Sequence, residues 1–117
     1  MATAALNLVV IRSPNIDSSA AFYLALGITF SKHSHGTGPE HYASEDGGVT
    51  FEIYPETDST LTTTATRIGF KVADLDALLP MLVERGGRIA SPAKDSPWGR
   101  RAVLIDPTGH KVELLQE

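Results

Sequence analysis

Cysteine is absent from the 117 residues of this chain, and its absence excludes several kinds of chemistry. Without thiols the protein forms no disulfides, has no cysteine nucleophile and offers no thiolate ligands to a metal. A chain without disulfides is typical of a reducing compartment, so we expect a cytoplasmic protein. The sequence also lacks an apolar run of the roughly 18 to 20 residues that span a membrane, and its N-terminus lacks the pattern of a signal peptide. No membrane partner is therefore expected.

A surplus of basic residues is also absent. The chain has 10 Lys and Arg residues against 14 Asp and Glu residues, which gives a formal net charge of −4. Proteins that bind phosphate backbones need basic patches, so no nucleic-acid partner is expected. The short motifs of P-loop, zinc-protease and α/β-hydrolase sites are missing as well. The sequence therefore predicts a small globular protein, and its candidate site follows from the pattern of strands and helices rather than from a short motif.

The first half of the sequence predicts a βαβββ pattern. Residues 6–12 are rich in β-branched side chains, which predicts a strand. Asn15 and Asp17 are good helix-capping residues, and they predict a helix over Asp17–Leu26 that ends before Gly27. Turn-rich stretches separate three further predicted strands, at residues 28–33, 41–45 and 49–54.

The second half repeats this order. A predicted strand at 66–72 precedes a predicted helix over Asp74–Arg85, in which apolar residues recur with helical spacing. Pro80 is expected to kink or weaken this helix because its ring removes a backbone donor. Three more strands are predicted, at 88–90, 99–106 and 111–116. The length favours one domain (1–117) with modules at about 5–55 and 64–116 and a polar linker at 56–63.

Matched positions indicate that the two halves arose by internal duplication. With an offset of 59 residues Gly27 aligns with Gly86, and with an offset of 61 residues Glu52 aligns with Glu113. Strand alternation places Glu52 and Glu113 opposite the apolar residues of their strands. If helices cover the apolar faces, the opposite faces are polar. Such faces are either solvated or, where the sheets curve toward each other, line a cup.

The two modules, together with FYLALG, VADLDAL and PWGRRAVLIDPTGHKVELLQ in this order, resemble the vicinal oxygen chelate superfamily over Leu6 to Gln116. This superfamily includes glyoxalase I, bleomycin and fosfomycin resistance proteins and extradiol dioxygenases. The resemblance implies an α+β fold in which two βαβββ modules form curved mixed sheets around a cup, with helices on the outer face. It also implies a homodimer, but it does not by itself imply a reaction.

In metal-dependent members a divalent ion is held by the first and last strands of the modules. Carried onto this chain, those places are Leu8, Glu52, Arg67 and Glu113. Leu8 has no lone pair and Arg67 is a permanent cation, so we expect no metal and no cofactor, with a divalent metal as the less favoured alternative. Arg67 is expected within hydrogen-bonding distance of at least one carboxylate. It either plugs an ancestral site or helps to select ligands by charge.

Aromatic residues are the other candidates for ligand contacts. Trp98 lies in the predicted loop SPWGRR, where it is either a lid over the cup or a plug at a dimer seam. Tyr42 and Tyr54 are further candidates, and Phe30 suits either the ligand or the core. The predicted ligand-binding set is therefore Leu8, Tyr42, Glu52, Tyr54, Arg67, Trp98 and Glu113, and no catalytic residue is predicted.

The four histidines are predicted to lie outside any metal site. His33 and His35 belong to a Gly-rich region where surface histidines are common. His41 is expected at an exposed strand end, with a place in the lining of the cup as the less favoured alternative, and His110 is expected to point outward from the turn in DPTGH.

Two functions remain open from the sequence. One is a small-molecule-binding protein of the glyoxalase/bleomycin resistance type that binds an organic ligand in the cup without a catalytic metal. The alternative is a metal-dependent lyase or dioxygenase with an atypical site. A metal assay on the purified protein would distinguish them.

Overall fold

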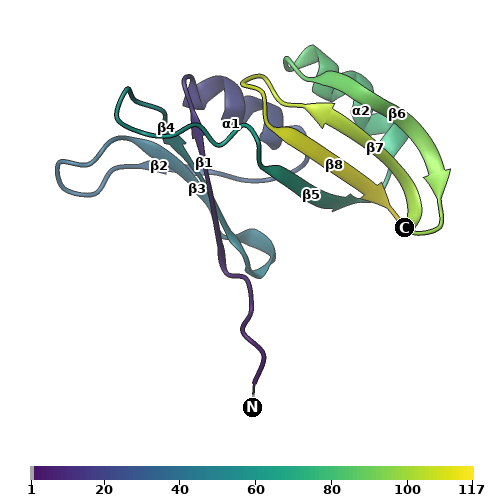
Figure 1. Ribbon diagram of the computed structural model, residues 1–117, viewed down its shortest axis with the longest axis horizontal. Helices are drawn as coiled ribbons and strands as arrows, with labels where there is room; N and C mark the ends of the chain where they lie inside the picture. The colour runs from purple at the N-terminus through teal and green to yellow at the C-terminus, as the bar shows by residue number, and fades with distance from the viewer. Residues whose placement is uncertain (1) are drawn as a thin grey trace.

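Two four-stranded sheets and two α-helices make up the fold in a computed structural model that describes residues 2–117 (Figure 1). The first module contains β1 (Leu8–Ser13), α1 (Ile16–Leu24), β2 (Ser31–His33), β3 (His41–Ser44), the short 3-10 helix η1 (Asp46–Gly48) and β4 (Thr50–Pro55). The second contains β5 (Arg67–Val72), α2 (Leu75–Glu84), β6 (Arg88–Ser96), β7 (Gly99–Ile105) and β8 (Lys111–Gln116). The predicted α+β class and the βαβββ order of both halves are confirmed.

The two sheets have the same topology. Their strand orders are β1-β4-β3-β2 and β5-β8-β7-β6, with the first pair of each sheet parallel and the other pairs antiparallel. Both sheets are curved, and neither closes into a barrel (Figure 1). This repeated strand order agrees with an internal duplication, and it leaves β1 and β5 at sheet edges.

The two helices begin and end at equivalent residues. The side chain of Asn15 accepts a hydrogen bond from the Ser18 backbone N–H at 3.1 Å, and that of Asp74 accepts one from Ala77 at 3.2 Å. Gly27 and Gly86 follow the helices with φ of 89° and 95°, a conformation that glycine adopts without strain. Pro80 lies inside α2 without ending it.

One apolar core joins the two modules. It includes Ile11, Phe22, Tyr23, Phe51, Ile53, Leu75, Leu82, Leu104, Val112 and Leu114, all buried. Tyr23 of α1 packs against Phe51 of β4 and Phe70 of β5, with ring centroids 5.1 and 5.9 Å away, and the two phenylalanine rings lie 6.0 Å apart. The apolar face of the first sheet is therefore turned toward the second module. Its polar face, which carries Glu52, points away from that module.

Strand β6 is longer than predicted. It runs from Arg88 to Ser96, and its pairing with β7 shifts register between Ile89 and Ser91 and again before Lys94. Such irregularities break the alternation on which strand prediction depends. Pro92 is tolerated because β6 lies at the sheet edge. Within residues 2–117, no helix is long and apolar enough to cross a membrane.

Candidate functional site

On the second sheet, Glu113 of β8 is held by two arginines from the neighbouring strands. Arg67 of β5 approaches its Oε1 atom at 3.3 Å, which confirms the predicted contact between Arg67 and a carboxylate. Arg101 of β7 donates to the same oxygen at 2.5 Å. The side chains of Arg67 and Glu113 are 51% and 31% exposed, so this cluster is partly solvated rather than buried. Two guanidinium groups facing one carboxylate leave a net positive charge.

Sequence reasoning missed Arg101, although a signal for it was present. Ala102 and Leu104 of β7 are buried in the core. Strand alternation therefore turns Arg101 toward the face that carries Glu113.

On the first sheet, Glu52 of β4 lies beside His41 of β3. The Oε2 atom of Glu52 is 3.7 Å from Nε2 of His41, whose side chain is 1% exposed. The His41 ring stacks on Tyr54 with ring centroids 4.1 Å apart, and the Arg12 guanidinium carbon lies 5.1 Å from the centre of the Tyr54 ring. The expectation that His41 is exposed is wrong, because the adjacent Tyr54 ring and Glu52 cover it.

The four positions at which metal-dependent relatives carry ligands do not form an ordinary metal site in this chain. Leu8 is exposed and offers no donor atom. Arg67 is a cation paired with Glu113, and among residues 2–117 it has no ion pair with Glu52. Glu52 and Glu113 belong to different sheets and have different partners. A catalytic Zn²⁺ needs about three protein donors around one point, and this set does not supply them.

The predicted aromatic residues lie in different environments. Tyr54 shares the polar face of Glu52, whereas Tyr42 points to the opposite face, where its hydroxyl donates to Asp17 at 2.6 Å. Phe30 packs against Tyr42 and Phe51 at the margin of the core. Trp98 lies in the β6–β7 turn and is 74% exposed. Its two predicted roles, as a lid over the cup and at a dimer seam, stay predictions.

A groove of about 650 Å³ lies between the first sheet and β5. Apolar side chains form much of its wall, among them Val9, Ile28, Phe51 and Phe70. Its charged lining residues are Arg67, Lys71 and Asp46, and Lys71 is paired with Glu117 at 2.8 Å. Gly69 leaves space on the same strand. Sequence reasoning missed this groove because it is formed by the packing of β5 beside the first sheet, which no local pattern reveals.

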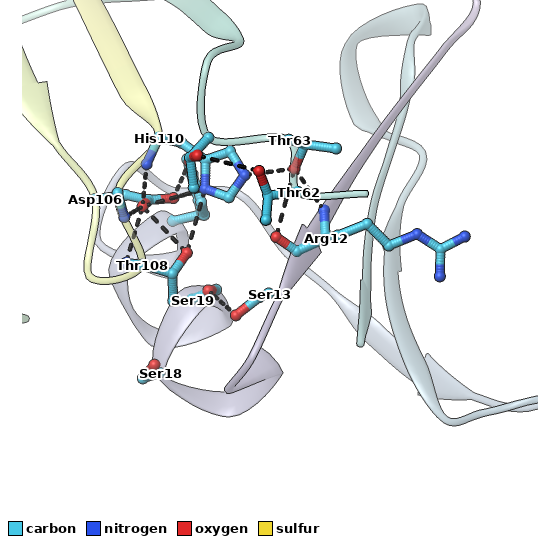
Figure 2. Close-up of polar contacts among 12 residues, drawn as sticks. Arg12, Ser13, Ser18, Ser19, Thr62, Thr63, Asp106, Thr108 and His110 are labelled. Atoms are coloured by element: carbon cyan, nitrogen blue, oxygen red, sulfur yellow. Dashed lines mark hydrogen bonds and ion pairs between the residues drawn. The ribbon is translucent and has the colours of Figure 1, made fainter. Parts of the chain in front are cut away.

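A buried polar network ties the linker at 56–63 to both modules (Figure 2). His110 is fully buried; its Nδ1 lies 3.1 Å from Oδ2 of Asp106 and its Nε2 lies 2.6 Å from the Thr63 hydroxyl. The Thr63 hydroxyl also accepts from the Arg12 backbone N–H at 2.8 Å. The prediction that His110 points outward is therefore wrong, and the linker is more than a spacer. The turn residues that suggested an exposed histidine instead fold it inward against Asp106.

This network has the order acid, imidazole, hydroxyl that nucleophilic sites use, but its environment is structural. Burial would raise the pKa of Asp106, yet hydrogen bonds from His110 and Tyr23 prevail and hold that pKa below its usual value. Burial, and then the charge of Asp106, raises the pKa of Tyr23. The Thr63 oxygen is engaged by both Arg12 and His110. A fully buried imidazole and an occupied hydroxyl favour a stabilising role over attack on a substrate.

Comparison with known proteins identifies the family. Residues 5–114 match the Glyoxalase/Bleomycin resistance protein/Dioxygenase superfamily. An uncharacterized protein from Mycolicibacterium smegmatis is 35% identical over 104 residues, which cover 88% of this chain and 85% of that relative.

Two solved structures with related folds are ligand-binding proteins. TnmS3, an antibiotic binding protein from Streptomyces sp. CB03234, has a TM-score of 0.77 and 22% identity, with 99% of this chain and 98% of that chain covered. The bleomycin-binding protein from Streptomyces verticillus, complexed with copper(II)-bleomycin, has a TM-score of 0.63 and 20% identity, with coverage of 100% and 99%. These identities show a shared fold. The family match and the duplicated βαβββ architecture together show that this chain belongs to the Glyoxalase/Bleomycin resistance protein/Dioxygenase superfamily.

Proposed function

We propose that this protein binds a small organic ligand that has an apolar body and an acidic group, without a catalytic metal at the four superfamily ligand positions. The groove of about 650 Å³ carries the proposal. Its size falls within the range of small-molecule sites, and such sites combine an apolar wall with a few polar groups that orient the ligand. Phe51 and Phe70 supply apolar surface, and Arg67 supplies positive charge.

The charge of the ligand follows from the partners of Arg67. Glu113 balances only one of the two guanidinium groups that approach it. An acidic ligand group would balance the second, and guanidinium binds carboxylates, sulfates and phosphates through paired hydrogen bonds. Ligand binding by two relatives of similar fold, one of antibiotics and one of bleomycin, is consistent with this role.

The alternative is a metal-dependent lyase or dioxygenase with an atypical site. The observation that favours it is the retention of Glu52 and Glu113 at matched places in the two modules. A metal at these places would have to compete with Arg67 and Arg101 for Glu113. The donor set therefore supports the binding protein more strongly than the enzyme.

A homodimer is the second part of the proposal. β1 is an edge strand, and Leu6, Leu8 and Val10 on it or just before it are exposed. The polar face with Glu52 points away from the second module of its own chain, so only another surface can enclose it. A second subunit would cover the apolar strip of β1 and turn this face into one wall of a cup.

Ligand titration tests the proposal. Isothermal titration with aromatic carboxylates, matched aromatic amines and bleomycin is carried out with a chelator present, so that metal plays no part. We expect saturable binding that prefers acidic compounds. Gly69→Leu should block the groove and Arg67→Ala should weaken binding of acids at least about tenfold, the loss of one charge-assisted contact. Lys111→Ala, which removes a neighbouring charge of β8 outside the groove, is the control.

Two results would contradict the proposal. One is binding that Gly69→Leu leaves unchanged, since this would place the ligand elsewhere. The other is a tightly held metal that is lost when Glu113 alone is changed to Gln, because that result would favour the metal-dependent alternative.

A further inference from the structure

Three of the four histidines meet at one end of the first sheet. His33 ends β2 and His41 begins β3, and these two residues are paired across the strands, while His35 lies in the connecting loop. One ring nitrogen of each lies within 4.8 Å of one ring nitrogen of the other two. We propose that His33, His35 and His41 bind a divalent transition-metal ion such as Zn²⁺, with Glu52 as a fourth ligand.

The Nε2 atom of His41 points to this use. It is buried, and it has no hydrogen-bond partner among the described residues. The other ring nitrogen, Nδ1, lies 3.2 Å from the backbone oxygen of Pro39. In the tautomer that donates from Nδ1 to this carbonyl, Nε2 carries a lone pair. Metal-binding histidines are usually held in this way, with the second nitrogen donating to a carbonyl or carboxylate.

Glu52 is placed to complete the ligand set. Its Oε2 atom is 3.7 Å from Nε2 of His41, beyond hydrogen-bonding range. Two ligands of a tetrahedral Zn²⁺ with bonds of about 2.0 to 2.1 Å lie about 3.3 Å apart, so a shared ion fits this separation with little movement. The stacked Tyr54 ring fixes the plane of His41. His35 is exposed and His33 half-buried, so their rings are free to turn toward the ion.

The surroundings suit a cation and give it an entry path. His33 lines a hollow of about 300 Å³ together with Glu45 and Asp46. These carboxylates raise the local concentration of cations beside His33, and the hollow opens His33 to solvent. The site differs from the one that metal-dependent relatives use, because Leu8, Arg67 and Glu113 take no part in it.

The donor atoms define the class of ion. Imidazole nitrogens suit Zn²⁺, Ni²⁺ and Cu²⁺, whereas Mg²⁺ and Ca²⁺ prefer sets of oxygen atoms. All three histidines belong to the β2–β3 connection. A bound ion would therefore fix the loop at residues 34–40 against the sheet and raise the thermal stability of the protein by mass action.

Zinc titration of metal-free protein without a histidine tag tests this site. A chromophoric chelator reports free Zn²⁺, and thermal melts are recorded in parallel. We expect one Zn²⁺ per chain, a rise in Tm with Zn²⁺, and no rise with Mg²⁺. His35→Ala should weaken binding at least about tenfold, as loss of one of four ligands requires. Ser34→Ala, a change at the adjacent loop position that removes no ligand, should bind like the wild type.

Copper(II) gives an independent readout of the ligand atoms. The electron paramagnetic resonance spectrum should show coupling to several imidazole nitrogens, and His35→Ala should reduce their number. The inference fails if wild-type protein shows no saturable Zn²⁺ binding, or if His35→Ala and Ser34→Ala bind equally well. Because the organic-ligand titrations are made with a chelator present, this inference and the proposed ligand-binding function can fail separately.

Discussion

At the scale of single residues, Glu113 shows how a second partner changes the expected effect of a substitution. If Arg67 were the only partner of Glu113 and the pair were buried, Arg67→Ala would lower the free energy of unfolding by several kcal/mol, because Glu113 would be left as an unpaired buried charge. The structure shows a half-exposed Arg67 and a second cation, Arg101, on the same oxygen. The pair therefore belongs with partly solvated salt bridges, which contribute little individually.

We expect Arg67→Ala to lower the free energy of unfolding by less than about 1 kcal/mol, since Arg101 still neutralises Glu113. The double variant Arg67→Ala/Arg101→Ala should lose more stability than the two single variants lose together, because Glu113 then has neither arginine as a partner. Urea denaturation of the four proteins measures this difference. Strict additivity would show that the two arginines do not act on one carboxylate.

Asp106 should control stability in acid. Asp106→Asn should lower the free energy of unfolding at pH 7 by about 2 to 4 kcal/mol, because a buried charged acceptor of several hydrogen bonds is lost. Its folded-state pKa is below the unfolded value of about 3.9, so its contribution is fully present above about pH 4 and disappears as the pH falls through the folded pKa.

Stability measured by urea denaturation between pH 5 and pH 3 checks the sign of this effect. The wild type should lose more stability over this interval than Asp106→Asn. Asp58→Asn, at an exposed linker position, should follow the wild type. Parallel curves for the wild type and Asp106→Asn would show that this carboxylate does not titrate differently in the folded state.

At the scale of elements, the equivalent helix caps invite a matched test. Asn15→Ala and Asp74→Ala should each lower the free energy of unfolding by about 1 kcal/mol, because each removes the acceptor for a backbone N–H in the first turn. Asn7→Ala precedes β1 and removes no cap, so it should have little effect. Thermal or urea unfolding measures the stability of all three variants. If a cap variant is as stable as the wild type, that side chain does not stabilise its helix as a cap.

Elements governed by local chemistry were well predicted from the sequence. The capping residue Asn15, the glycine after the first helix and the apolar spacing of the second helix placed both helices within two residues of their observed ends. Alternation also placed the apolar faces of β4 and β8 correctly. β6 was predicted too short because its register shifts interrupt the alternation.

Features that depend on contacts between distant segments were not predictable in this way. The burial of His110 depends on Thr63 of the linker, 47 residues away in sequence. The histidine cluster depends on a loop that folds His35 back toward the strands. Arg67 was placed correctly beside a carboxylate, but the groove beside it results from the packing of two modules.

At the scale of the whole molecule, the exposed apolar strip of β1 leads to a prediction about assembly. If β1 lies in a dimer interface, Leu8→Glu should shift the protein toward the monomer of 12.5 kDa, because it places a charge in a buried contact. Leu61→Glu changes an equally apolar and more exposed linker residue and should leave assembly unchanged. Sedimentation velocity at several concentrations measures both, and a wild-type monomer at micromolar concentration would contradict the dimer.

The parallel pairing of first and last strands has a consequence for how fast the chain folds. In each module the first strand pairs with the last strand, so this pairing joins distant parts of the sequence. Leu8 pairs with Thr50, and Arg67 pairs with Lys111. Contacts across such separations close long loops before any pairing energy is gained, which slows folding. We expect refolding on a scale of milliseconds to seconds in stopped-flow experiments, although the helices alone form in about a microsecond. Because both modules use the same pairing, β1 can also pair with β8 in place of β4. We expect chains that are mispaired in this way to refold in a separate, slower phase.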